Sequence, residues 1–338
     1  MSISDKSRNA ELGVCRGSLR GFVSVRCVLY YVCCLLYFLP FLGAQAIETG
    51  TADPYFKNSI IRVSSSLVSV PVSVTDASGR GIADLLIEDL RVEEDGRPAE
   101  ISRLSDSSQS NLNIAVLFDI SGSVNPNFKF EQDAAVNFLK KIWKEGDAVT
   151  IVSFDQEPVI RLKSGDNLQE AMWTLRQLRP TEKTTSFFDA VILAARHIDQ
   201  QASEETRQAM IVISDGADNT SKSNLTDALA EMQRRDAVFY AINPSGASVR
   251  LNRINIKGQE NLETLARATG GAVFVTDDIS DLGSIFGKIE SELRAQYLLH
   301  YYSPSQRMDG KFHSIEVSIP GQPELNIRAR PGFLDIPR

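Results

Sequence analysis

The sequence predicts an α/β fold: a doubly wound, mostly parallel sheet inserted between β segments that form a small β-sandwich. Three observations support this prediction. In the middle of the chain, short runs of branched apolar residues alternate with segments whose apolar residues recur at helical spacing. On both sides of this region, apolar and polar residues alternate with the period of two that is typical of strands. With 338 residues, the chain also exceeds what one hydrophobic core usually supports, so two folding units are expected.

The first 46 residues are expected to be a signal peptide. Five basic residues precede an apolar run at 27–43, and Ala44-Gln45-Ala46 has the small-residue pattern of a signal-peptidase site. An uncleaved membrane anchor is the alternative, although the run is short for a spanning helix. Both interpretations predict an exported protein: periplasmic, cell-surface or secreted. Residues 47–58 are expected to be a linker.

The composition restricts the possible partners. All four cysteines lie within the leader, so the mature chain has neither disulfides nor thiolate ligands for a metal. Cleavage after Ala46 leaves 31 Lys and Arg against 41 Asp and Glu, a net charge of −10. A surface with this charge repels nucleic acid and anionic membranes. We therefore expect no nucleic-acid partner, and membrane contact only through an uncleaved leader.

Residues 59–107 are expected to be the amino-terminal part of the β-sandwich. The first strand is marked by four valines at alternate positions, Val68, Val70, Val72 and Val74. Pro71 within it indicates an edge strand or a bulge, because proline cannot donate a ladder hydrogen bond. Two further strands are predicted on either side of the tight turn at Asp95-Gly96.

Residues 297–335 are expected to be the carboxy-terminal part of the sandwich. A strand is predicted at 297–302, a hairpin turn at 309–310, and a final strand at 324–330. Between them, apolar or aromatic positions alternate cleanly at His313, Ile315, Val317 and Ile319. Neither flank can bury much surface by itself. We therefore expect the two flanks to combine, with residues 111–296 inserted between them.

Residues 111–296 alternate strands and helices in the manner of a doubly wound fold. The predicted strands are 114–118, 148–154, 208–214, 237–242 and 272–275, with 157–162 as an antiparallel partner of the second. The predicted helices are 131–144, 168–178, 186–201, 224–235, 262–269 and 279–296. The long polar loop at 243–259 is either a recognition loop or a plain surface insertion.

Oxygen-bearing side chains gather where the first buried strand of this region ends. Asp119, Ser121 and Ser123 follow the apolar run at 114–118 at alternate positions. In an open α/β sheet, ligands bind at the carboxyl ends of the strands. One carboxylate and two hydroxyls suit a hard cation such as Mg²⁺ or Ca²⁺ and do not suit zinc. Taken alone, such residues are more often turn formers or helix caps.

Two later segments make a cation site the stronger interpretation. The buried strand at 208–214 also ends in an aspartate and a glycine, Asp215 and Gly216. Thr185 stands where a helix begins, with Thr184 as the neighbouring alternative. Since these strand ends belong to the same sheet edge, the side chains are expected to converge on one point.

Together these residues resemble the metal-ion-dependent adhesion site of von Willebrand factor A domains. All five positions of that motif are filled, in the order in which the family has them: Asp119, Ser121, Ser123, Thr185 and Asp215. A softer likeness to exported bacterial proteins of the VWFA-related type, seen for example in residues 93–96 and 328–333, extends over most of the mature chain.

The resemblance implies how each residue acts. The hydroxyls of Ser121, Ser123 and Thr185 are the expected direct ligands, whereas Asp119 and Asp215 act mostly through bound water. Neutral ligands leave the ion with residual positive charge. The resemblance therefore implies a six-coordinate Mg²⁺ ion, with Ca²⁺ or Mn²⁺ as alternatives, and one open position. The expected occupant of that position is a carboxylate from a partner protein.

The predicted function is that of an exported protein that binds a divalent cation and, through it, an acidic side chain of a protein partner, in adhesion or in assembly of an envelope complex. Catalysis and small-molecule substrates are not expected, because no histidine stands beside a nucleophile and no glycine-rich phosphate loop occurs. A Mg²⁺-dependent hydrolase with Asp119 as nucleophile is one alternative, but Ser121 occupies the position where such enzymes carry a second aspartate. A structural module with a vestigial metal site is the other.

Overall fold

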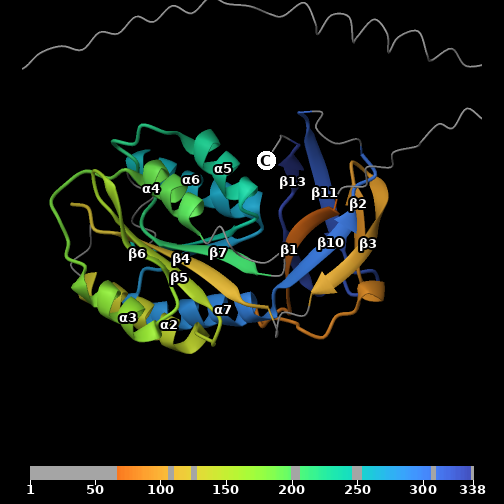
Figure 1. Ribbon diagram of the computed structural model, residues 1–338, viewed down its shortest axis with the longest axis horizontal. Helices are drawn as coiled ribbons and strands as arrows, with labels where there is room; N and C mark the ends of the chain where they lie inside the picture. Colours follow the sequence, from red (N-terminus) through yellow and green to blue (C-terminus); the bar gives the residue numbers. More distant parts are fainter. Residues whose placement is uncertain are drawn as a thin grey trace, which may run out of the picture. The chain divides into compact units, whose positions relative to one another are not determined.

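The computed structural model describes residues 67–105, 110–122, 128–198, 206–245, 253–305 and 310–335. The predicted signal peptide at 1–46 and linker at 47–58 lie outside these residues. The described residues belong to one unit, Arg62–Arg338, which contains a six-stranded and a seven-stranded sheet (Figure 1). Every helix within the described ranges is too short or too polar to cross a membrane.

The six-stranded sheet confirms the predicted α/β fold. Its strand order is β6-β5-β4-β7-β8-β9, and only the edge strand β6 is antiparallel to its neighbour. The strands are β4 (Leu112–Asp119), β5 (Ala148–Phe154), β6 (Pro158–Gly165), β7 (Arg207–Ile213), β8 (Val238–Asn243) and β9 (Ala272–Val275). All residues of β4 are buried. A strand at the centre of a parallel sheet with both faces covered must be apolar throughout, which explains its composition.

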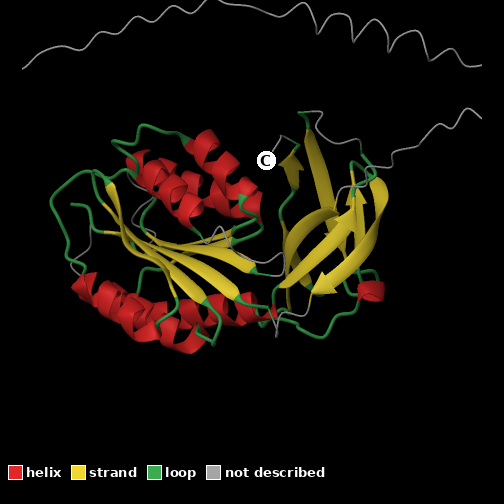
Figure 2. Cartoon of the chain, viewed as in Figure 1, coloured by secondary structure: helices red, strands yellow, loops and turns green. Residues whose placement is uncertain are grey.

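Helices cover both faces of this sheet (Figure 2). One face carries α2 (Phe128–Ile142), α3 (Leu168–Gln177) and α7 (Leu282–Ala295). The other face carries α4 (Phe187–His197), α5 (Leu225–Arg234) and α6 (Arg253–Thr269). Because successive side chains of a strand point to opposite faces, β4 contributes to both cores. Ile114, Val116 and Phe118 enter the first core, while Ala115 and Leu117 enter the second.

The start of α6 corrects one prediction. The polar loop was expected to extend over 243–259, but its second part is helical from Arg253 onwards. Gly258 suggested a loop, yet it lies inside the helix because two backbones pack closely there. At Gly216, whose φ is +74°, an added Cβ would overlap the carbonyl oxygen of Gly258. Close packing against the end of β7 therefore accounts for both glycines.

The seven-stranded antiparallel sheet joins the two flanks of the chain. Its order is β12-β1-β10-β3-β2-β11-β13. The amino-terminal flank supplies β1 (Leu67–Thr75), β2 (Arg91–Glu94) and β3 (Arg97–Ser105), with the short 3-10 helix η1 (Ile87–Asp89). The carboxy-terminal flank supplies β10 (Tyr297–Tyr302), β11 (Phe312–Ser318), β12 (Asn326–Ala329) and β13 (Gly332–Leu334). Since β1 pairs with β10 and β12, and β2 pairs with β11, the prediction that the flanks combine around an inserted α/β region is confirmed.

This sheet curls around a core of its own (Figure 1), in which Val70 and Val72 of β1 lie with Leu299 of β10. Pro71 was predicted to mark an edge strand or a bulge, and neither is found: β1 lies between β12 and β10, and its register with β10 is continuous from Leu67 to Val72. Its pairing with β12 begins only at Val72, so the proline precedes the ladder on that side. The missing N–H therefore removes no hydrogen bond to β12.

Buried polar contacts fix the end of α7 where it leads into β10. The guanidinium of Arg207, which is 2% exposed, donates to the backbone carbonyls of Leu293 and Gln296. The carboxylate of Glu292 accepts a 2.6 Å hydrogen bond from the Tyr240 hydroxyl and pairs with Arg328 of β12. These contacts join the core of the α/β region to the antiparallel sheet.

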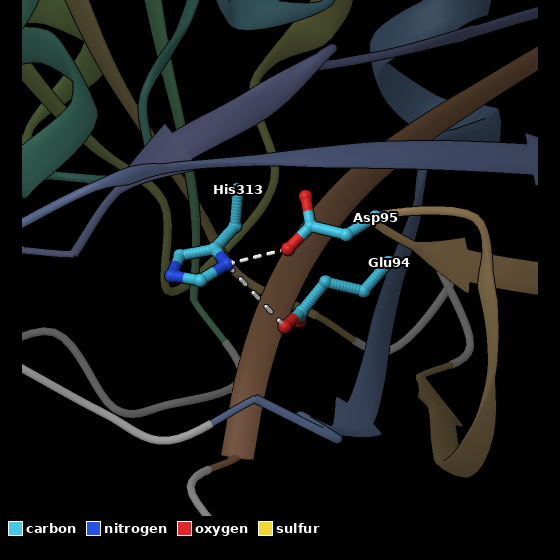
Figure 3. Close-up of side chains that lie close together, drawn as sticks. All are labelled: Glu94, Asp95 and His313. Atoms are coloured by element: carbon cyan, nitrogen blue, oxygen red, sulfur yellow. Dashed lines mark hydrogen bonds and ion pairs between the residues drawn. The ribbon is translucent and has the colours of Figure 1, made fainter. Parts of the chain in front are cut away.

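A second polar cluster closes the β2–β3 turn onto β11 (Figure 3). Nδ1 of His313 lies 2.7 Å from Oδ2 of Asp95 and 3.9 Å from Oε1 of Glu94. Glu94 is fully buried, and its carboxylate accepts 2.7 Å hydrogen bonds from the hydroxyls of Tyr301 and Ser303. We call Glu94, Asp95 and His313 the β-turn clasp.

Candidate metal centre

Three loops meet at the carboxyl ends of β4 and β7. Asp119 is the last residue of β4, and the loop after it carries Ser121. The loop before α4 carries Thr185, and the loop after β7 carries Asp215. Ser123, the fifth predicted residue, lies outside the described residues. Since β4 and β7 are adjacent and parallel, two of these loops leave the sheet at the same edge.

Backbone hydrogen bonds tie the three loops together. The N–H of Gly122 donates to the carbonyl of Lys183 at 2.7 Å, which joins the first loop to the second. The N–H groups of Asn219 and Thr220 donate to the carbonyl of Thr185 at 2.9 and 3.2 Å, which joins the third loop to the second. The segment around Thr185 is thus bound on both sides.

Asp119 is held by hydrogen bonds from two strand ends. Its Oδ1 accepts the backbone N–H of Ser121 at 2.9 Å, and its Oδ2 accepts the hydroxyl of Ser214 at 2.8 Å. Burial is the main reason that the pKa of Asp119 is raised to about 6. The negative charge of Asp215 acts in the same direction, whereas the hydrogen bonds from Ser121 and Ser214 act against it.

The remaining predicted residues are also withdrawn from solvent. Ser121 is 0% exposed and Thr185 is 1% exposed, whereas Thr184 is exposed. Asp215 is half-buried; its Oδ1 accepts the N–H of Ala217 at 3.0 Å, and burial raises its pKa. Two carboxyl groups and two hydroxyls thus lie at strand ends and on loops that hydrogen bonds join, and each offers the kind of oxygen atom that a hard cation prefers.

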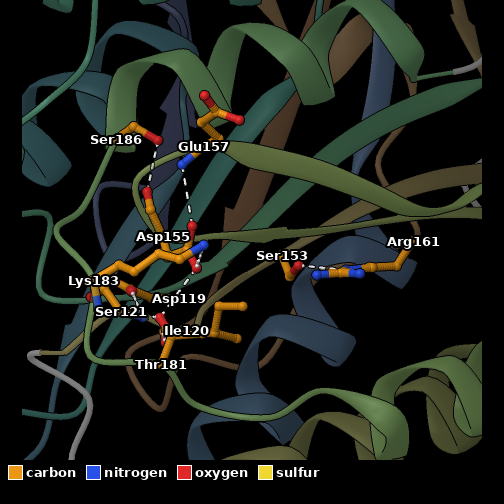
Figure 4. A network of polar contacts seen from close by, with 10 residues as sticks. All are labelled: Asp119, Ile120, Ser121, Ser153, Asp155, Glu157, Arg161, Thr181, Lys183 and Ser186. Atoms are coloured by element: carbon orange, nitrogen blue, oxygen red, sulfur yellow. Dashed lines mark hydrogen bonds and ion pairs between the residues drawn. The ribbon is translucent and has the colours of Figure 1, made fainter.

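A polar network supports these loops from the side of β5 (Figure 4). The Thr181 hydroxyl lies 3.0 Å from the carbonyl of Ile120 and 3.1 Å from Oδ2 of Asp155, which also pairs with Lys183 at 3.3 Å. The backbone carbonyl of Asp155 accepts both the N–H and the hydroxyl of Ser186 at 2.8 Å. Burial alone would raise the pKa of Asp155, but the N–H of Glu157 and the ammonium of Lys183 outweigh it and lower the pKa.

Asp155 and Ser214, which contact the candidate metal centre or its loops, were not among the residues predicted from the sequence. Asp155 directly follows Phe154, the last residue of β5, so it satisfies the same strand-end rule that selected Asp119 and Asp215. Ser214 follows β7 in the same way. That rule, applied to every strand of the sheet, would have found both.

The β-turn clasp is a separate group of possible metal ligands. Within the described part of the chain, it is one group of three His, Asp or Glu side chains whose ligand atoms lie within 4.8 Å of one another. Both of its carboxylates already form hydrogen bonds within the protein. Glu94 accepts from the hydroxyls of Tyr301 and Ser303. Asp95 bonds to His313 and accepts the N–H of Ser314 at 2.9 Å. These hydrogen bonds account for the geometry of the clasp without a metal.

The match of a family model agrees with this architecture. The family model of the von Willebrand factor type A domain matches residues 113–288, more than half of the chain. A comparison with curated proteins gave no match. One similar solved structure is the hypothetical protein BatB from Bacteroides thetaiotaomicron, with 17% identity, a TM-score of 0.42, and coverage of 54% of this chain and 98% of that one.

Two others are proximal thread matrix protein 1 from the mussel byssus and a von Willebrand factor type A protein from Catenulispora acidiphila. The mussel structure has a zinc-occupied MIDAS motif; its identity is 17%, its TM-score 0.47, and the match covers 60% of this chain and 49% of that one. The Catenulispora structure has 11% identity, a TM-score of 0.45, and coverage of 79% and 72%. On the match of the family model, the chain belongs to the von Willebrand factor type A domain family.

Proposed function

We propose that this protein binds a divalent cation through Asp119, Ser121, Ser123, Thr185 and Asp215, and that the cation binds a carboxylate of a protein partner. The observation that carries this proposal is the assembly of two carboxyl groups and two buried hydroxyls on loops bonded to one another. The negative charge of Asp215 disfavours the ionised form of Asp119. A cation between them would compensate that repulsion, so the donor set fits a metal.

The hydrogen bonds of Asp119 favour an indirect role for its carboxylate. Both of its oxygens already accept a hydrogen bond from the protein. Binding through water is therefore easier for Asp119 than direct coordination. The hydroxyls of Ser121, Ser123 and Thr185 then remain as direct, neutral ligands, and the ion keeps positive charge for an incoming carboxylate.

Mg²⁺ is the proposed ion, with Ca²⁺ or Mn²⁺ as alternatives, because the donor set contains only oxygens. The zinc in the mussel protein is a property of that structure. An exported location is part of the proposal, and it rests on the basic and apolar leader at 1–46. There the partner would be an envelope or extracellular protein that presents an acidic side chain.

A metal titration with matched variants tests the proposal. We expect Asp119→Ala and Ser121→Ala to abolish Mg²⁺ binding in isothermal titration calorimetry while the far-UV circular dichroism spectrum stays unchanged. Asp133→Asn is the control, because Asp133 is an exposed residue of α2 whose partner is Lys129. Unaltered Mg²⁺ affinity in both site variants would reject the assignment. Capture of partners from the native envelope fraction, with and without chelator, then tests the protein-binding step.

The same geometry disfavours the hydrolase alternative. A nucleophilic carboxylate must reach its substrate. Asp119 is 6% exposed, and hydrogen bonds hold both of its oxygens. Metal-dependent turnover of a model phosphate ester, lost in Asp119→Asn, would restore that alternative.

A further inference from the structure

Helix α2 buries a carboxylate that has no assigned role. Glu131 is 3% exposed, and its Oε1 atom has no hydrogen-bond partner among the described residues. Taking a carboxylate out of water without a partner is costly. A stable fold keeps such a group when an interaction other than the described contacts offsets this cost of desolvation.

Two other buried glutamates of the same fold are compensated by arginine. Glu231 on α5 is 5% exposed, and its carboxylate lies 3.0 to 3.7 Å from the guanidinium groups of Arg196, Arg234 and Arg235. Glu292 on α7 pairs with Arg328. In the described part of the chain, Glu131 forms no ion pair of this kind. A bound cation would supply the counter-charge that no side chain of these segments gives it.

The position of Glu131 indicates which cation. One turn earlier on α2, Phe128 packs edge-on against Phe118, with ring centroids 5.3 Å apart, and Phe118 immediately precedes Asp119. Residues three apart share a helix face, so Glu131 lies on the face of α2 that meets the end of β4. Burial raises the pKa of Glu131 to about 7, and the negative charge of Asp119 contributes to that shift. The two carboxyl groups are thus close enough to repel each other.

We propose that Glu131 is a third carboxylate of the candidate metal centre, which binds the cation indirectly and raises the affinity of the site for a divalent ion. This inference rests on the proposed function. With Asp119 and Asp215, Glu131 brings the formal charge of the site to −3, which favours a doubly charged ion over K⁺ or Na⁺. Groups that act on a metal through water or through its ligands typically change metal affinity by roughly 10–100-fold.

The test is a Mg²⁺ titration of the full chain with three variants. Glu131→Gln keeps the size of the side chain and removes its charge, so we expect Mg²⁺ affinity to fall by roughly 10–100-fold. Glu131→Asp keeps the charge and should retain more affinity than Glu131→Gln. Glu231→Gln removes a buried glutamate of the same type away from the centre and should leave affinity unchanged. Far-UV circular dichroism and melting without metal confirm that each variant is folded.

Each outcome decides one point. Equal affinities of Glu131→Gln and the wild-type protein would overturn the inference and leave Glu131 as a buried neutral acid. Equal losses in Glu131→Gln and Glu131→Asp would also overturn it, because shape rather than charge would then matter. A wild-type protein that binds no Mg²⁺, Ca²⁺ or Mn²⁺ would reject the proposed function itself, which distinguishes the two failures.

Discussion

The hydroxyl of Ser214 donates a 2.8 Å hydrogen bond to Oδ2 of Asp119, and it thereby connects the ends of the neighbouring strands β7 and β4. The same hydroxyl accepts the N–H of Gly216 at 3.1 Å. The orientation of Asp119 is therefore set jointly by its own loop and by the loop that carries Asp215. Ser214 is a positioning residue of the candidate metal centre.

Replacing Ser214 should weaken metal binding without unfolding the protein. In Ser214→Ala, Asp119 loses a hydrogen bond that fixes its carboxylate, and we expect Mg²⁺ affinity to fall by roughly 10-fold or more. The fold should lose about 1 kcal/mol, the usual contribution of one hydrogen bond. Calorimetric titration and urea unfolding measure the two effects. Ser153→Ala is the control, since Ser153 lies on β5 and bonds to Arg161 instead; the prediction is wrong if both variants bind Mg²⁺ alike.

The chelated protein should lose stability as the pH rises from 5 to 8. The pKa of Asp119 is raised from 3.8 to about 6 and that of Glu131 from 4.5 to about 7. An acid whose pKa is raised by folding stabilises the folded state while it is protonated. Its contribution to the free energy of unfolding is therefore present at low pH and is lost as the pH rises through the folded-state pKa. Carboxyl groups with lowered pKa values, such as Asp155 and Asp189, make the folded protein more stable as the pH rises, but they do so only at lower pH.

Thermal melting in excess chelator, at one-unit steps of pH, measures this dependence. Saturating Mg²⁺ should reduce the loss of thermal stability with rising pH, because a bound cation stabilises the ionised carboxylates. Asp119→Asn and Glu131→Gln should each flatten the chelated curve, because each variant removes one of the two carboxyl groups with a raised pKa. Curves that match the wild-type protein in both variants would contradict the assignment of the pH dependence.

The sequence predicts most of the α/β region because its signals are local. A run such as 114–118 is apolar at every position only if the strand is buried on both faces, and β4 is buried throughout. The two flanks were also predictable, since strict alternation from Val68 to Val74 indicates a strand, and all four of these valines lie in the core of the antiparallel sheet. Both signals depend on neighbouring residues alone.

Features that depend on distant partners were not predictable in the same way. Gly258 breaks a helical pattern locally, and only its contact with Gly216 explains why a helix passes through it. The role of Ser214 depends on Asp119, which lies 95 positions away along the chain. Glu131 did carry a local signal: it is a charged residue in the stripe that buries Phe128, Ala134 and Ala135. A charged residue within an apolar helix face indicates that its interaction partner does not lie on that face.

Loss of the buried Arg207 should destabilise the junction between α7 and β10. Arg207→Ala would leave the carbonyls of Leu293 and Gln296 without their charged donor in a buried site. Hydrogen bonds to charged groups contribute roughly 1.5–3 kcal/mol each, so we expect the free energy of unfolding to fall by about 3 kcal/mol or more. Urea unfolding measures the loss, with the exposed Arg80 replaced by alanine as the control. Similar losses in both variants would contradict a special role of Arg207.

The β-turn clasp should contribute to stability and not to metal binding. In Glu94→Ala, the buried hydroxyl of Tyr301 loses its acceptor, so we expect a loss of about 1–3 kcal/mol in the free energy of unfolding. In His313→Ala, Asp95 loses its 2.7 Å partner while the stoichiometry of Mg²⁺ and Zn²⁺ binding stays the same. His197→Ala is the control, because its ring bonds only to the carbonyl of Leu193 on its own helix. If one equivalent of bound metal disappears in His313→Ala but persists in Ser121→Ala, the prediction is wrong. Glu94, Asp95 and His313 would then bind a metal, and the carboxylates would have exchanged their present hydrogen-bond partners for that ion.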